Sequence, residues 1–162
     1  MRVALGYHSR VGKDTIAAYL EANYKFRIVR FAQPLYEICS FAQETLGQPQ
    51  SKDPSLMQKM ADLCKDRYGQ DVFVKRAMEE IDQMSWNENI VVVDLRFLNE
   101  AEELKKRGFV LWSIDRANRP RDRDQTHSSE TELSGYVFDV TVSNNDTIDN
   151  LLSKVDGLLE TI

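Results

Sequence analysis

The feature that most constrains the fold is the stretch at residues 3–15, which reads Val-Ala-Leu-Gly-Tyr-His-Ser-Arg-Val-Gly-Lys-Asp-Thr. An apolar run ends at Gly6, and apolar residues recur at helical spacing from Thr15, which predicts a strand, a loop and a helix. A helix N-terminus carries unpaired N–H groups and a partial positive charge, and a glycine lets the loop approach phosphate oxygens closely. We therefore expect a phosphate-binding loop with Lys13 directed at the outer phosphates. Its residues would be Ser9, Arg10, Val11, Gly12, Lys13, Asp14 and Thr15.

This stretch departs from the usual phosphate-loop pattern, G-x-x-x-x-G-K-[ST], in two places. Gly6 lies six residues before Gly12 rather than five, so either the loop is one residue longer or Tyr7 fills the first glycine position. Asp14 stands where a magnesium-binding Ser or Thr is expected, and Thr15 follows it. The alternative interpretation is an ordinary strand-to-helix turn whose lysine is solvated.

Length and composition indicate one globular domain over residues 1–162. The chain is 42% hydrophobic and 29% charged, which is typical of an ordinary globular protein. Cys39 and Cys64 lie within apolar helical patterns, so we expect buried thiols rather than a disulfide. The sequence has no run of about 18 apolar residues, and it enters a strand directly at its N-terminus. The expected location is therefore the cytoplasm, without membrane association.

The charge distribution separates one basic segment from an acidic whole. A net charge of −5 argues against broad nucleic-acid binding, which usually needs a basic surface. Residues 116–123 nevertheless hold four arginines, beside Asp122 and Asp124. One interpretation is a solvated charged loop. The other, which we favour because the segment follows a predicted strand end, is a lid over bound phosphates that adds arginines and excludes water.

The order of predicted elements indicates an α/β fold. We expect strands at residues 2–5, 26–31, 89–94, 109–114 and 136–142. We expect helices at residues 15–24, 34–46, 56–68, 71–84, 98–107 and 147–159. Strands that alternate with helices predict a parallel sheet of about five strands with helices on both faces. Residues 48–54 are the most linker-like, and we expect a surface loop there rather than a domain boundary.

Two polar residues follow the buried apolar strand at residues 89–94. Asp94 ends that strand, where ligands bind in α/β sheets, and Arg96 comes two residues later. Mg²⁺ prefers oxygen ligands, so Asp14 or Asp94, or both, are the expected metal contacts. A guanidinium can bind a phosphate through two hydrogen bonds, so Arg96 is expected to hold an acceptor phosphate. The alternative for Arg96 is a surface ion pair with a nearby glutamate.

The histidines are less informative from chemistry alone. His8 lies inside the loop and could touch a phosphate or an acceptor. His127 has no assignable mechanism, and a helix that begins near Ser128 with acidic residues in its first turn explains its neighbours. The spacing of Cys and His residues does not favour a zinc site, and no Ser-His-Asp arrangement is suggested.

Five short motifs in order give the chain a family resemblance. They are G-K-D-T at residues 12–15, F-A-x-P-L at 31–35, D-x-R-F-x-N-E-A-E at 94–102, H-x-S-E at 127–130 and N-[ND]-x-[ST] at 144–147. With these motifs the chain resembles the bacteriophage deoxynucleoside monophosphate kinase family, a branch of the P-loop nucleotide kinases. The resemblance runs through most of the chain.

This resemblance implies ATP-dependent phosphorylation of a deoxynucleoside 5′-monophosphate to its diphosphate, with Mg²⁺. It implies an acceptor-binding helical region at about residues 34–88, a lid at about 116–130, and an Asp14 that is a family trait. By position, Lys13, Asp14, Asp94, Arg96, Arg116 and Arg121 would serve catalysis. Arg119 would join the loop in holding ATP, and Asn144 and Asn145 would hold its adenine. Acceptor contacts would come from His8, Glu37, Arg67, Arg96, His127 and Glu130.

Two other functions remain open from the sequence. Related phage kinases phosphorylate a hydroxymethylated pyrimidine already in DNA, although the acidic net charge weighs against a duplex acceptor. A catalytically silent nucleotide-binding module could use the same fold. The acceptor's identity and the oligomeric state, including a homodimer, are also open.

Overall fold

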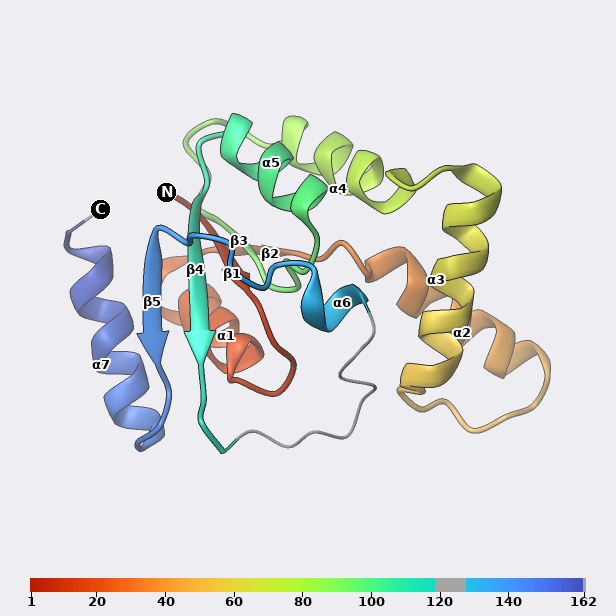
Figure 1. Ribbon diagram of the computed structural model, residues 1–162, viewed down its shortest axis with the longest axis horizontal. Coiled ribbons are helices and arrows are strands. Elements are labelled where there is room, and N and C mark those ends of the chain that lie inside the picture. Colours follow the sequence, from red (N-terminus) through yellow and green to blue (C-terminus); the bar gives the residue numbers. More distant parts are fainter. Residues whose placement is uncertain (119–127, 162) are drawn as a thin grey trace. The chain divides into compact units, whose positions relative to one another are not determined.

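The computed structural model describes residues 1–118 and 128–161 (Figure 1). The chain divides into two compact units. The first, here called the sheet unit, comprises Met1–Val29 and Met84–Ile162. The second, here called the helical unit, comprises Arg30–Gln83.

Five strands of the described part form one sheet in the order β2-β3-β1-β4-β5. Every neighbouring pair is parallel, as the alternation of strands and helices predicts. The strands are β1 (Arg2–Gly6), β2 (Arg27–Val29), β3 (Ile90–Val92), β4 (Val110–Asp115) and β5 (Val140–Ser143). All five residues of β1 are buried, because this strand lies in the centre of the sheet with a helix layer on each side.

Helices cover both faces of the sheet, which confirms the predicted fold class (Figure 1). On one face, apolar strand residues pack against α1 (Lys13–Tyr24) and α7 (Ile148–Leu159). This core includes Val3, Leu5, Val91, Trp112, Ile114 and Val142 from the sheet, with Ile16, Leu20, Leu151 and Val155 from the two helices. On the other face, α5 (Leu98–Lys106) packs against β4 and buries Ala101 and Leu104.

The predicted fifth strand at residues 136–142 was wrong at its start. The strand begins only at Val140, because the side-chain carboxylate of Asp139, rather than a backbone oxygen, accepts a hydrogen bond from the neighbouring strand β4. The buried Leu111 N–H donates to Asp139 Oδ2 at 2.7 Å, while Asp139 N–H donates to Leu111 O at 3.0 Å. The same carboxylate pairs with Lys105 Nζ at 2.7 Å. The other strands and helices differ from the expected bounds by a few residues at their ends.

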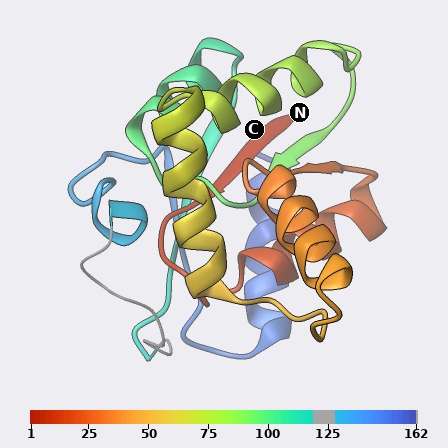
Figure 2. The same cartoon turned by 90° about the vertical axis from the view of Figure 1, so that its right-hand side faces the viewer.

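The helical unit contains α2 (Gln33–Thr45), α3 (Pro54–Tyr68) and α4 (Val72–Asp82). Figure 2 shows α2 and α3 side by side, and these two helices pack on each other. Helix α3 begins as its sequence predicts, because Pro54 occupies the first turn and Asp53 Oδ1 accepts the Leu56 N–H at 3.0 Å. Cys39 is buried and Cys64 half-buried, and both thiols are free.

The helices of residues 1–118 and 128–161 include none that is long and apolar enough to span a lipid bilayer.

The topology of the sheet unit selects one edge for a ligand. Strands β1 and β3 are neighbours in the sheet. The connection from β1 leads toward β2 at one edge of the sheet, and the connection from β3 leads toward β4 on the other side of β1. Connections that diverge in this way leave a crevice at the carboxyl ends of the two strands, where α/β sheets bind ligands. The loop after β1 and the segment that contains Asp94 and Arg96 both begin at this crevice.

We expect Asp139→Ala to lower the free energy of unfolding by about 1–3 kcal/mol, because the buried Leu111 N–H loses its acceptor. Asp139→Asn should cost less, since its side-chain oxygen can still accept. Urea unfolding of the two variants measures both effects. The matched control is Asp146→Ala, which removes an exposed ion pair with Lys154 and should cost less than about 1 kcal/mol. Equal losses for Asp139→Ala and Asp146→Ala would contradict this role.

The Asp139 contribution should also depend on pH. Burial alone would raise the pKa of this carboxyl, but the Leu111 N–H and the Lys105 ammonium outweigh burial and hold the pKa below its ordinary value. A lowered folded-state pKa means that the stabilisation is present above the ordinary pKa of aspartate and is lost as the pH falls through the folded-state value. The difference in unfolding free energy between wild type and Asp139→Asn should therefore shrink in acid.

Candidate active site

The loop between β1 and α1 requires glycine where it turns into the helix. Gly12 has φ 104°, in the left-handed region that other residues rarely adopt. A Cβ atom at this position would lie 2.6 Å from Asn144 Nδ2. That amide occupies the space because it donates to Val11 O at 2.8 Å. Asn144 is itself fixed at the end of β5, where its N–H donates to Asp115 O at 2.7 Å. The loop is therefore held against the end of the sheet through its own backbone.

Lys13 lies at the start of α1 and is almost completely buried. Helix α1 begins at Lys13 rather than at Thr15, so Lys13 and Asp14 belong to its first turn, which corrects the predicted boundary. The ammonium of Lys13 donates to the backbone oxygens of Tyr7, at 3.5 Å, and His8. The loop thus bends around this ammonium and presents two backbone oxygens to it.

Burial has a measurable consequence for the Lys13 ammonium. Desolvation, followed by the charge of Arg96, lowers the pKa of Lys13 to about 7. The carboxylates of Glu130, Asp94 and Asp14 act in the opposite direction. An anion bound beside the ammonium would stabilise its charged form and raise this pKa again.

Arg96 is held in place by the helix that follows it. Its backbone N–H and that of Phe97 donate to Glu100 Oε2, at 2.7 and 3.0 Å. Glu100 is buried in the first turn of α5, where a carboxylate also favours the helix dipole. The segment after β3 therefore has a defined path, and the Arg96 guanidinium extends from a fixed backbone.

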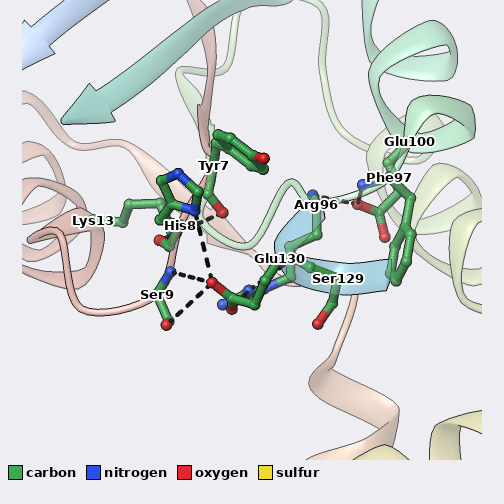
Figure 3. A network of polar contacts seen from close by, with 9 residues as sticks. All are labelled: Tyr7, His8, Ser9, Lys13, Arg96, Phe97, Glu100, Ser129 and Glu130. Atoms are coloured by element: carbon green, nitrogen blue, oxygen red, sulfur yellow. Dashed lines mark hydrogen bonds and ion pairs between the residues drawn. The ribbon is translucent and has the colours of Figure 1, made fainter. Parts of the chain in front are cut away.

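Glu130 links the loop to Arg96 (Figure 3). It lies in the short helix α6 (Ser128–Thr131), and its side chain is only 1% exposed. Glu130 Oε1 is 2.5 Å from Arg96 Nη1, which also donates to Ser129 O at 3.2 Å. Glu130 Oε2 accepts from the N–H and the hydroxyl of Ser9, each at 3.4 Å, and lies 3.8 Å from His8 Nδ1.

The electrostatics of Glu130 fit a carboxylate that stays ionised. Burial alone would raise the pKa of its carboxyl. The charge and hydrogen bond of Arg96 outweigh burial, with further support from the Ser9 N–H and Lys13, so the pKa remains below its ordinary value. The site therefore combines two largely buried cations with one buried anion.

Aromatic rings flank the loop on the side of Tyr7. The rings of Tyr7 and His8 stack with their centroids 3.8 Å apart. Phe138 lies against Gly6, where a Cβ atom would come within 2.8 Å of its ring, and it contacts Tyr7 and Tyr136. This packing shows why Gly6 accepts no side chain.

The structure brings together several of the residues expected from the sequence. Ser9, Lys13, Arg96, Glu130 and His8 meet in one network. The alternative for Arg96 was a surface ion pair with a glutamate. Arg96 does pair with a glutamate, but the pair is not at the surface, because its partner Glu130 is buried inside this network.

The predicted metal contacts occupy different environments. Asp14 and its neighbour Thr15 are exposed on the first turn of α1, whereas Asp94 is half-buried just after β3. Across residues 1–118 and 128–161, no cluster of three or more His, Cys, Asp or Glu side chains could hold a metal ion. A magnesium ion at Asp14 or Asp94 would thus draw further oxygen ligands from phosphate and water.

Other predicted residues lie at or beyond the margins of this network. Arg10 and Arg116 are exposed, and Val11 is buried. Asn145 Oδ1 accepts the Ala117 N–H at 2.8 Å and so shapes the chain just after β4. Glu37 and Arg67 belong to the helical unit, where both are exposed. Three residues lie outside the described part of the chain: Arg119, Arg121 and His127.

Sequence reasoning missed two groups that hold the site together. Glu100 had a recognisable signal, because a glutamate in the first turn of a helix commonly accepts from backbone N–H groups at the helix start. The Ser129 carbonyl had none, since a backbone oxygen leaves no mark in the side-chain pattern.

Together, the five-stranded parallel sheet, the helices on both of its faces and the loop after its central strand give an α/β fold that is consistent with that of P-loop nucleotide kinases. No family model matches the sequence. A protein of Acanthamoeba polyphaga mimivirus named "Putative deoxynucleotide monophosphate kinase" is 39% identical to this chain over 67 residues. The matched segment covers 41% of this chain and 34% of that relative.

We expect tripolyphosphate, used as a probe of the loop, to bind with an uptake of protons at about pH 8, because Lys13 is then mostly neutral in the free protein and becomes charged beside a bound anion. Affinity should accordingly fall as the pH rises above about 7. Calorimetric titrations in two buffers of different ionisation enthalpy measure the uptake. Lys13→Met is the control and should take up fewer protons. Equal uptake by the two proteins would show that Lys13 does not face the bound phosphates.

Proposed function

We propose that this protein transfers the terminal phosphoryl group of ATP to a deoxynucleoside 5′-monophosphate. The observation that carries this proposal is the position of two cationic side chains at one edge of the sheet. Lys13 follows β1, Arg96 follows β3, and one carboxylate couples the Arg96 side chain to the Lys13-containing loop. A phosphoryl-transfer site needs two such groups, one for the donor and one for the acceptor, more than it needs a covalent catalyst.

The donor half of the site is the loop before α1. The turn at Gly12 brings the backbone close to the helix N-terminus, where N–H groups and the helix dipole favour phosphate. Lys13 supplies a localised positive charge at the same place. These features fit the β- and γ-phosphates of a nucleoside triphosphate.

The acceptor half of the site is Arg96. Its side chain is 16% exposed, so it is largely enclosed by protein and still partly accessible to solvent. A guanidinium binds phosphate oxygens in pairs and orients them. In the transfer, an acceptor phosphate oxygen forms a bond to the γ-phosphorus while the bond to the leaving ADP oxygen breaks. The acceptor oxygen is already anionic near neutral pH, so this reaction requires no general base.

Mg²⁺ fits the site as a partner of the phosphates, and when bound it would neutralise charge on the transferred group. Asp94, just after β3, and Asp14, on the first turn of α1, are the residues that would engage it. Both would act directly or through water.

One observation supports a deoxynucleotide as the acceptor, and a second supports a small acceptor over DNA. The printed name of the mimivirus relative refers to deoxynucleotide monophosphates. The net charge of −5 favours a small anionic acceptor held by local cations over a long duplex.

A substrate panel tests the proposed activity. Labelled ATP with Mg²⁺ is offered to the four common deoxynucleoside monophosphates, to the corresponding ribonucleotides and to DNA that contains hydroxymethylated pyrimidines. We expect label in a deoxynucleoside diphosphate, and Lys13→Ala should abolish it while the thermal unfolding of the protein remains cooperative. Label in the DNA alone would favour the base kinase, and ATP binding without any transfer would favour a silent module; each result overturns the proposal.

Arg96 should act on the acceptor more than on ATP. Arg96→Lys retains the charge and loses the paired hydrogen bonds, so we expect the KM for the acceptor to rise and kcat to fall, with the KM for ATP nearly unchanged. A loss of about 10–100-fold in kcat/KM corresponds to the misorientation of one reacting group. Steady-state kinetics with each substrate varied in turn measure this pattern.

The control for Arg96 is Arg27→Lys, at the opposite end of the sheet, where an exposed arginine pairs with Glu88 at 3.9 Å. It should leave both KM values unchanged. A rise confined to the KM for ATP in Arg96→Lys would reject the acceptor role.

A further inference from the structure

We propose that Glu130 is a positioning residue that orients Arg96 and the phosphate loop together, and that it does not contact the substrate. This inference rests on the proposed kinase function and changes the role that the family resemblance implies for Glu130. It assigns to one carboxylate the relative placement of the donor and acceptor halves of the site.

The first argument is that protein groups surround the Glu130 carboxylate. One carboxylate oxygen accepts a hydrogen bond from Arg96 Nη1. The other accepts hydrogen bonds from the N–H and the hydroxyl of Ser9 and lies near His8. The side chain is 1% exposed, against 16% for Arg96 and 29% for His8. Of these three side chains, Glu130 is the least able to reach a ligand from solvent.

The second argument concerns charge. Both substrates are polyanions, so a carboxylate in contact with a phosphate would oppose binding. A carboxylate behind an arginine has the opposite effect, because it fixes the guanidinium and offsets the cost of burying it. Within the described residues, the contacts of the Arg96 guanidinium use Nη1 alone, with Glu130 and Ser129 O. The Nε and Nη2 groups of Arg96 can therefore donate hydrogen bonds to a phosphate.

The third argument is that the helix that carries Glu130 is itself anchored to the Arg96 segment. Glu132 Oε1 accepts the Leu98 N–H at 2.9 Å, at the start of α5. Leu133 is buried at 1% exposure, which holds the end of this helical turn in the core. Glu130 therefore extends from a backbone that is fixed on the acceptor side and reaches Ser9 on the donor side.

This arrangement makes Arg96 and the loop mutually dependent. If Arg96 lost its partner, its long side chain would sample several rotamers, and the Ser9 end of the loop would lose an acceptor. Misplacement of a reacting group by about 1 Å can cost about 100-fold in rate. The expected signature is a defect in both halves of the site from a residue that touches neither substrate.

The central variant is Glu130→Gln, which keeps an oxygen to accept hydrogen bonds and removes the charge. We expect kcat/KM for the acceptor to fall by about 10–100-fold, mainly through kcat, while cooperative unfolding is retained. The matched control is Glu88→Gln, which removes an exposed carboxylate that pairs with Arg27 outside this network and should lower kcat/KM by less than about 3-fold. Unchanged kinetics in Glu130→Gln would overturn the proposal, as would equal losses in the two variants.

A double-mutant cycle separates positioning from direct contact. If Glu130 acts partly through Arg96, the combined loss in the acceptor's kcat/KM should be smaller than the product of the two single losses, because Arg96→Lys already removes the part that runs through Arg96. If Glu130 touches the acceptor itself, the two losses should multiply. Multiplicative losses would therefore overturn the inference even if the enzyme is a nucleotide kinase.

A spectroscopic measurement keeps this inference distinct from the proposed function. In ¹⁵N-labelled protein without nucleotide, Glu130→Gln should shift the backbone amide signal of Ser9 and the side-chain Nε–H signal of Arg96, and Glu88→Gln should leave both in place. Unshifted signals would reject the positioning role whether or not the protein is a kinase. Shifted signals in a protein that transfers no phosphoryl group would instead reject the proposed function and leave the network intact.

Discussion

The site depends on keeping two positive charges inside the protein beside one negative charge. Lys13 and Arg96 are largely withdrawn from water, and burial opposes the charged form of the lysine strongly enough to bring its pKa to about 7. Glu130 stays ionised among these groups and offsets part of their cost. Such an arrangement favours an anion, because a bound phosphate would find two basic side chains already oriented and partly desolvated, and it would raise the pKa of Lys13 again.

The fold supplies this arrangement through its strand order. Parallel strands end at a common edge, and the neighbouring strands β1 and β3 send the chain away in opposite directions. The loop with Lys13 and the segment with Arg96 therefore start side by side, although β1 ends at Gly6 and β3 begins only at Ile90. Glu130 and Asn144, which come later in the chain, then fasten the loop through hydrogen bonds to Ser9 and to the Val11 carbonyl.

Much of the fold could be predicted from the sequence because its signals are local. The apolar run before Gly6 gives a strand buried on both faces, and the periodic residues of α1 and α7 give helices that cover one of them. Strand ends were less predictable. Asp139 shows the reason, since its side chain accepts a backbone N–H from Leu111, 28 residues earlier, and so delays the start of β5.

The candidate site, like the fold, has parts that local sequence predicts and parts that depend on contacts between distant segments. Residue type and spacing were enough to select the loop, its lysine and the Asp94–Arg96 segment as candidates, because strand ends and phosphate chemistry leave local marks in a sequence. Only the folded structure shows that Glu130 contacts Ser9 and Arg96. The same is true of the hydrogen bonds of Glu100 and Asn144 to backbone atoms of the two segments. These contacts join residues that the sheet brings to one edge, and no spacing within the sequence encodes that proximity.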